Sequence, residues 1–132
     1  MYHLDFDADA KEYAQWNIAM PSDWDADVVT AKFYWTAAAG AAGNVIWGLQ
    51  GISYGDDDAI DQAWGAAAEV ADAWIANGDE HITAATASIT LAGTPAAEED
   101  VQFRAYRDGA SGSDTMVNDA RLIKIKVTFT RT

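Results

Sequence analysis

Hydrophobic and polar residues alternate over several segments of this chain, which is the pattern of β-strands with one buried and one solvated face. The clearest case is residues 120–130, where branched and aromatic residues alternate with Lys and Thr. The β-branched and aromatic side chains of these segments suit a half-buried sheet. Four further segments share the pattern: residues 14–20, 28–36, 45–54 and 100–107.

Shorter segments complete the set of predicted strands. Residues 81–85 and 88–91 predict one or two strands, and residues 2–6 predict another near the N-terminus. About eight strands at intervals of roughly 8–15 residues are typical of two packed antiparallel sheets or a barrel. The long connections between the strands favour a jelly-roll sandwich over a simple meander. The sequence therefore predicts an all-β protein with an antiparallel, jelly-roll-like β-sandwich.

Residues 56–78 are ambiguous. Hydrophobic residues recur there at helical spacing, and the acidic start suits a helix N-terminus, but Gly65 interrupts the pattern. The preferred interpretation is one short helix over residues 57–64, followed by a strand around residues 69–74. A single long helix is the alternative.

The chain contains no linker rich in Pro and Ser and no repeat, so a single domain is predicted. Residues 1–13 are expected to form an N-terminal arm, and residues 14–132 the sandwich domain. On the strand at residues 14–20, Trp16, Ile18 and Met20 share one face and are expected to point inward.

Composition and charge narrow the classes of function. Half of the 132 residues are hydrophobic, which is enough for a real core, and no apolar run approaches the roughly 20 residues of a membrane span. We therefore expect a soluble protein without membrane contact. The absence of cysteine excludes disulfides and Cys-ligated zinc. A net charge of −13 argues against nucleic-acid binding and fits either a solvated outer surface or a saline habitat.

No catalytic motif stands out. The two histidines, His3 and His81, are not near a Gly-x-Ser-x-Gly elbow, and no pair of carboxylates is singled out by its surroundings. Glycine loops that bind phosphate are absent as well. The protein is therefore predicted to be no enzyme and to use no cofactor.

An acidic cluster offers the one candidate set of metal ligands. Hard cations such as Ca²⁺ take carboxylate oxygens, although the spacing here is not that of an EF-hand. The competing interpretation is a helix N-cap, in which Asp side chains accept backbone N–H groups. The cluster consists of Asp56, Asp57, Asp58 and Asp61.

Six tryptophans raise the question of a sugar-binding surface. Those in predicted strands are expected to be buried. Trp24, in a polar loop, and Trp64, beside Gly65, are the two candidates for exposure. They would pack in the core or between subunits, or contact a glycan.

Short motifs in order along nearly the whole chain resemble a family of small tailed-phage proteins that are virion or fibre-associated domains. They include residues 20–24 (Met-Pro-Ser-Asp-Trp), 47–51 (Trp-Gly-Leu-Gln-Gly), 91–96 (Leu-Ala-Gly-Thr-Pro-Ala) and 101–108 (Val-Gln-Phe-Arg-Ala-Tyr-Arg-Asp). The resemblance implies a structural protein of the virion, most simply a capsid decoration (cement) protein or a head-fibre protein. It would bind itself, as a homotrimer, and other virion proteins such as the major capsid protein. The alternative is a tail-fibre domain that binds a receptor or glycan.

The expected contact residues lie in the arm and one loop. Tyr2, Leu4 and Phe6 alternate with polar residues, so the arm is predicted to add a strand to the sheet edge of a neighbour. Trp24 is predicted to pack between subunits.

Overall fold

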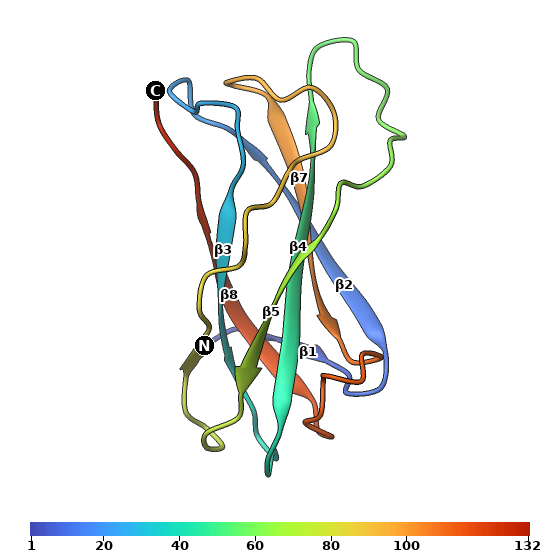
Figure 1. The fold of residues 1–132 in the computed structure, drawn as a ribbon, viewed down its shortest axis with the longest axis vertical. Helices are drawn as coiled ribbons and strands as arrows, with labels where there is room; N and C mark the ends of the chain where they lie inside the picture. Colours follow the sequence, from blue (N-terminus) through green and yellow to red (C-terminus); the bar gives the residue numbers. More distant parts are fainter.

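Eight strands and no helix make up the computed structural model, which describes all of residues 1–132 (Figure 1). The strands are β1 (Leu4–Phe6), β2 (Lys11–Ala19), β3 (Thr30–Thr36), β4 (Asn44–Tyr54), β5 (Ala68–Ala73), β6 (His81–Ile82), β7 (Asp100–Asp108) and β8 (Ala120–Thr128).

The strands form two four-stranded antiparallel sheets, packed face to face. Sheet A has the order β1-β8-β3-β6, and sheet B has the order β2-β7-β4-β5. The first strand thus pairs with the last, the second with the seventh, the third with the sixth and the fourth with the fifth. This is the nested pairing of a hairpin rolled into two sheets, so the predicted jelly-roll sandwich is confirmed.

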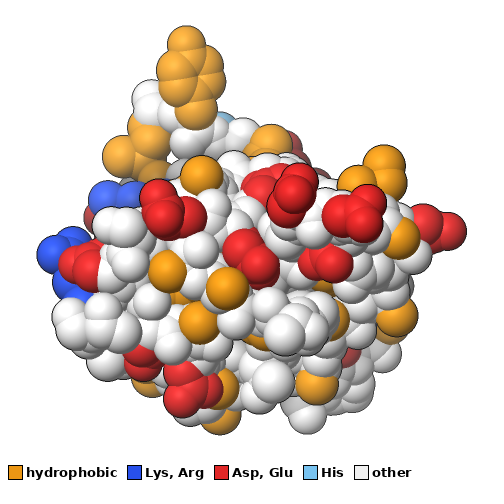
Figure 2. Space-filling model, turned by 90° about the horizontal axis from the view of Figure 1, so that it is seen from above, with side chains coloured by type: hydrophobic (Ala, Val, Ile, Leu, Met, Phe, Trp, Pro, Cys, Tyr) orange, Lys and Arg blue, Asp and Glu red, His pale blue; other side chains and the backbone are white.

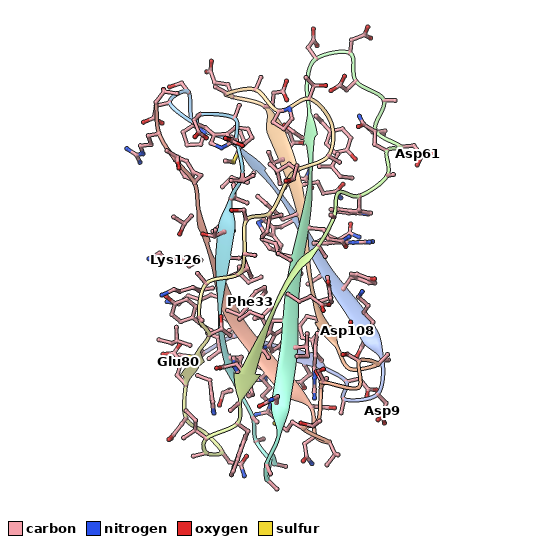
Figure 3. The ribbon with its side chains drawn as sticks, viewed as in Figure 1. Asp9, Phe33, Asp61, Glu80, Asp108 and Lys126 are labelled. Carbon is pink, nitrogen blue, oxygen red and sulfur yellow. The ribbon has the colours of Figure 1, made fainter.

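The core lies between the inward faces of the two sheets. On β3, Phe33 and Trp35 are fully buried, and the labelled ring of Phe33 lies in the middle of the sandwich (Figure 3). On β4, Trp47 is also fully buried and stacks on Phe33, with 5.8 Å between ring centroids. Phe6 meets Trp47 edge-on at 5.3 Å. These contacts join both sheets, and each buried aromatic side chain contributes roughly 1.5–3 kcal/mol.

The outward face of β4 is covered as well. Gly48 lies under the ring of Tyr106, which occupies the place of a Cβ atom, so only glycine fits there. The Tyr106 hydroxyl donates a 2.9 Å hydrogen bond to the Glu69 carboxylate. Burial and this hydrogen bond to Glu69 raise the pKa of Tyr106 above its ordinary value.

The predicted short helix at residues 57–64 is wrong, and so is the alternative of one long helix. Ile60 is 87% exposed, so no surface is present against which an amphipathic helix would pack. The Gly55 N–H instead donates to the Asp58 carboxylate at 2.7 Å, and Asp57 has a φ of 68°, which closes a turn. The predicted strand around residues 69–74 is confirmed as β5.

The two strands predicted at residues 81–85 and 88–91 are mostly wrong, because only His81–Ile82 is a strand. Side-chain hydroxyls replace much of the ladder along β3. The backbone N–H of Phe33 donates to Thr83 Oγ1, and that of Ala31 donates to Thr86 Oγ1, each at 3.1 Å. A short bridge from Val29 to Ile89 ends this run.

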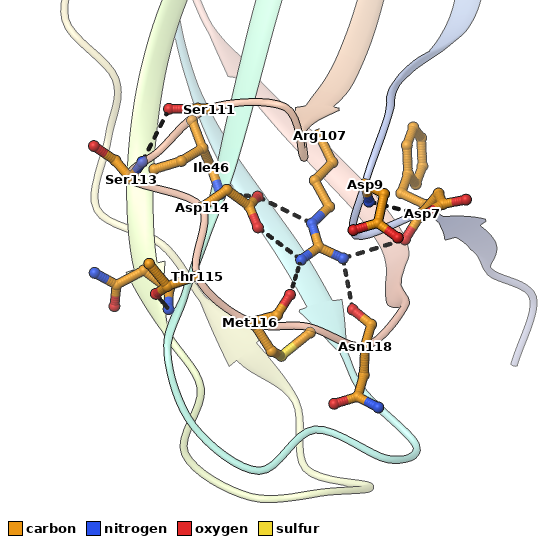
Figure 4. A network of polar contacts seen from close by, with 12 residues as sticks. Asp7, Asp9, Ile46, Arg107, Ser111, Ser113, Asp114, Thr115, Met116 and Asn118 are labelled. Atoms are coloured by element: carbon orange, nitrogen blue, oxygen red, sulfur yellow. Dashed lines mark hydrogen bonds and ion pairs between the residues drawn. The ribbon is translucent and has the colours of Figure 1, made fainter.

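A buried arginine links several segments of the chain by hydrogen bonds at one end of the sandwich (Figure 4). Arg107 is fully buried, and its Nε and Nη2 atoms donate to the two carboxylate oxygens of Asp114 at 3.0 and 2.7 Å. Its other N–H groups donate to the carbonyls of Met116, Asn118 and Phe6. All five donors are therefore used. The carboxylate and the carbonyls thus compensate the burial of the Arg107 charge.

The N-terminal arm predicted at residues 1–13 is largely part of the sandwich. Residues 4–6 form β1 in sheet A, and the predicted boundary at residue 13 falls inside β2. Phe6 is 3% exposed and belongs to the core. The physical reason is that the side chain of Phe6 packs against Trp47 in the core.

Candidate functional site

A groove opens between the two sheets along one side of the sandwich, which we call the open flank. It has a volume of about 650 Å³ and lies between β2, the edge strand of sheet B, and β1 with β8 in sheet A. A cavity of this size and lining is typical of a binding site. The main hydrophobic residues that line it are Trp16, Ile18, Met20, Ile125, Val127 and Phe129.

On the β2 side, the inward face of the strand is only partly covered. Trp16 is half-buried and stacks on Phe103, with 5.6 Å between ring centroids. Trp16, Ile18 and Met20 share the inward face as predicted, but while Met20 is buried, Ile18 is 48% exposed. The physical reason is position: β2 pairs only with β7, and its inward face meets the groove instead of a facing strand.

On the other side, β8 is longer than the strand beside it. β1 pairs with β8 only from Leu122 to Ala120, and an irregularity in the pairing with β3 falls at Ile123. Beyond it, residues 123–128 have β3 on one side and no strand on the other. Their free N–H and C=O groups form an open edge beside apolar side chains, the usual template for strand addition.

Exposed hydrophobic side chains stand at the rim of the groove. Met1 is 92% exposed, Tyr2 is 99% exposed and Leu4 is 55% exposed. Tyr2, His3 and Leu4 also contribute to the lining of the groove. Figure 2 shows a group of hydrophobic side chains that stands clear of the rest of the surface. The structure thus brings together two predicted contact residues, Tyr2 and Leu4, at one end of the groove.

The other two predicted contact residues lie in the interior. Phe6 packs on Trp47, and Trp24 is 2% exposed, so neither side chain is available to a partner. Trp24 forms a bridge with Arg131 in the C-terminal segment, which covers the polar loop. Of the alternatives that the sequence left open for Trp24, the structure shows burial in the core, so its predicted packing between subunits is wrong. Trp64 is half-buried, and the guanidinium of Arg104 covers one of its faces at 4.5 Å.

The groove and the surface beside it carry less negative charge than the rest of the molecule. No Asp or Glu lines the groove, although the chain carries 21 acidic residues. Next to it, on the outer face of sheet A, Lys32 and Lys126 are direct cross-strand neighbours, and Lys124 lies over the Tyr34 ring at 4.9 Å. The labelled Lys126 points away from the core (Figure 3), and Figure 2 shows Lys and Arg gathered at one side of an acidic surface.

The acidic cluster predicted as a metal site lies in the loop between β4 and β5. The labelled Asp61 points outward from this loop in Figure 3. Asp58 accepts the Gly55 N–H, while Asp56, Asp57 and Asp61 are exposed. No group of three or more His, Cys, Asp or Glu side chains is arranged to hold a metal ion.

The buried histidine has a structural role. His81 is 2% exposed, and its Nε2 accepts a 2.9 Å hydrogen bond from the Ile75 N–H. Its Nδ1 lies 3.0 Å from the Asp79 carbonyl, so Nδ1 carries the proton. The ring stacks on Trp35 at 4.3 Å. His3 lies near Asp5 at the surface, at 3.6 Å. Neither histidine ring has a Ser or Cys side chain as hydrogen-bond partner.

Sequence reasoning missed the groove itself. The sequence predicted only that hydrophobic and polar residues alternate over residues 120–130, and Val127 and Phe129, which lie on the inward side, are only half-buried. Alternation identifies the face of a strand, and it carries no information on whether a strand of the other sheet covers that face. No local signal marks the groove, because the uncharged stretch at residues 13–21 is shorter than the uncharged stretch at residues 33–55, which contains the central strand β4.

Comparison with protein-family models, with curated proteins and with solved structures finds no match. The structure contains no helix long and apolar enough to cross a membrane.

Proposed function

We propose that this chain is a structural protein of a tailed-phage virion, a capsid decoration or head-fibre protein that binds the particle surface as an oligomer. The observation that carries the proposal is the open flank, where an apolar groove, a free strand edge and the exposed side chains of Tyr2 and Leu4 meet. An apolar groove beside a free strand edge is a common place for a partner to bind.

Two further features support an assembly role. The jelly roll is common among viral capsid proteins, an argument from fold analogy alone. The sequence motifs described above resemble virion and fibre-associated proteins, and the open flank offers a surface for such a role. The acidic remainder of the surface keeps the free protein soluble before assembly.

The glycan-binding alternative has less support. It required Trp24 or Trp64 to present a free ring face to solvent. Trp24 is buried, and Arg104 covers one face of Trp64. Neither tryptophan ring is free to stack on a sugar as an open platform would be.

The test is attachment to phage particles from which the protein has been removed. Wild-type protein should bind the particles and cosediment with them, and the variant Tyr2→Ser/Leu4→Ser should bind at least about tenfold more weakly, because two exposed apolar contacts are lost. Ile60→Ser/Val117→Ser is the matched control, since both side chains are exposed away from the groove. Absence of wild-type protein from particles at any concentration would refute the proposal.

A further inference from the structure

We propose that the N-terminal segment of one copy, residues 1–4, occupies the open-flank groove of a second copy as an added strand beside β8. The inference rests on the proposed function, since it names the partner of the surface on which that function depends. The occupant is a second copy of this chain because the chain itself carries the matching segment at the rim of the groove.

The hydrogen-bonding geometry defines the position of the segment. The free edge of β8 runs from residue 123 to 128, which leaves room for four residues after the native β1. In the assembled form Leu4 gives up its pairing with Leu122 of its own chain, while Asp5 and Phe6 keep theirs. An antiparallel segment with its Leu4 opposite Ile125 of the second copy then has its Tyr2 opposite Val127. Directly paired residues point to the same face of a sheet, so both side chains enter the groove. The alternation of Tyr2 and Leu4 therefore matches the alternation of Ile125 and Val127.

The size and polarity of the groove fit this occupant. A volume of about 650 Å³ accommodates a tyrosine and a leucine side chain together. Tyr2 and Leu4 are 99% and 55% exposed in the single chain, so both gain apolar contact when they enter. The hydroxyl of Tyr2 extends toward the open mouth, where water remains available.

Charge favours this side of the molecule as the contact between copies. Each chain carries a net charge of −13, so two copies repel each other over most of their surface. The groove lining contains no Asp or Glu, and residues 1–4 contain none either. Lys124 at the groove adds a positive charge. Two copies thus approach at the lowest electrostatic cost through the open flank.

The direction of the strands determines the type of assembly. The segment is antiparallel to its own β8, through β1, and antiparallel to β8 of the neighbour. The two β8 strands therefore run in the same direction, as in a ring whose axis lies along the strands. Each copy gives one segment and receives one, which makes the contact head-to-tail. Such a contact forms a ring when the rotation between copies closes and a filament when it does not, and the homotrimer predicted from the sequence is one such ring.

Disulfide trapping between singly substituted chains tests the contact directly. The natural chain has no cysteine, so Tyr2→Cys and Val127→Cys each introduce one thiol. The proposed register places these two residues opposite each other, at the roughly 4.5–5.5 Å Cα separation at which disulfides form. A mixture of the two variants should yield a disulfide-linked pair of unlike chains, and Tyr2→Cys mixed with Ile60→Cys should yield at least about tenfold less.

Equal trapping in the control mixture, or none in either, would overturn the proposal. So would the double variant Tyr2→Cys/Val127→Cys if it closed an internal disulfide and stayed monomeric, since the segment would then fill its own groove. Sedimentation equilibrium covers the case in which Val127→Cys fails to fold. The exposed pair Tyr2→Ser/Leu4→Ser should weaken association at least about tenfold, and Ile60→Ser/Val117→Ser should not.

The dependence of association on salt concentration is a second, independent test. Added NaCl screens the repulsion between acidic copies and leaves the apolar contact intact, so association should strengthen as salt rises. Weakening by salt would overturn the proposal in favour of a charge-paired contact, such as the lysines of sheet A against an acidic face. Trapping on isolated protein and attachment to particles can fail separately, so the outcome for this contact is distinguishable from that for the proposed function.

Discussion

The two sides of the sandwich are closed to different degrees. On the side of β5 and β6, the Trp35 indole N–H donates a 2.8 Å hydrogen bond to Asp72, which joins sheet A to sheet B. His81 stacks on the same indole and accepts the Ile75 N–H. On the open flank no hydrogen bond joins β2 to β1 or β8, and the groove separates them. One fold thus has a side that stabilises the monomer and a side that is suited to a partner.

The comparison predicts the largest loss of stability on the closed side. Trp35→Ala should lower the free energy of unfolding by about 3–5 kcal/mol, because a fully buried ring is removed. Trp16→Ala, on the open flank, should cost about half as much, since that ring is only half-buried. Urea denaturation of both variants measures the difference. Equal losses would contradict the distinction between the two sides.

The hydrogen bond across the closed side should account for a smaller effect. Asp72→Ala leaves the buried Trp35 N–H without its acceptor, so we expect a loss of about 1–3 kcal/mol in the same denaturation experiment. Asp61→Ala is the matched control, because Asp61 is exposed and has no hydrogen bond in the structure. A control variant that lost as much stability would show that the effect is a general one of charge.

The smallest expected effect concerns pH and lies on the outer face of sheet B. Burial and the hydrogen bond to Glu69 raise the pKa of Tyr106 in the folded state, while the unfolded chain ionises near its ordinary value of about 10. The stabilisation is therefore complete below pH ~10 and is lost as the pH rises further. Denaturation midpoints between pH 8 and 11 should fall less steeply for Tyr106→Phe than for wild type. Parallel curves would contradict the assignment.

The sequence predicted well those features that depend on one strand at a time. The alternation around Phe33 and Phe103 identified buried faces correctly, because the two-residue period of a strand is a local property. It failed at residues 57–64, where helical spacing is present but no surface exists for Ile60 to pack on. The polar residues around Trp24 also gave no indication that its ring is buried, because the segment that covers it, at Arg131, is distant in the sequence.

The candidate site was the least predictable feature for a related reason. Tyr2 and Leu4 were identified from alternation near the N-terminus, whereas the groove that they border exists only because β2 is an edge strand and β1 is short. Edge positions are set by the order of strands in the sheets, and that order depends on contacts between residues far apart in the chain.

The pairing of the first strand with the last has a consequence for how the protein is made. β1 finds its place only against residues 120–122, so a ribosome releases almost the entire chain before this ladder can form. Until then Tyr2 and Leu4 have no neighbours on β8. Several chains emerging close together on one messenger would meet with these N-terminal segments still free, and encounter during translation would then be a natural route to the proposed contact between copies.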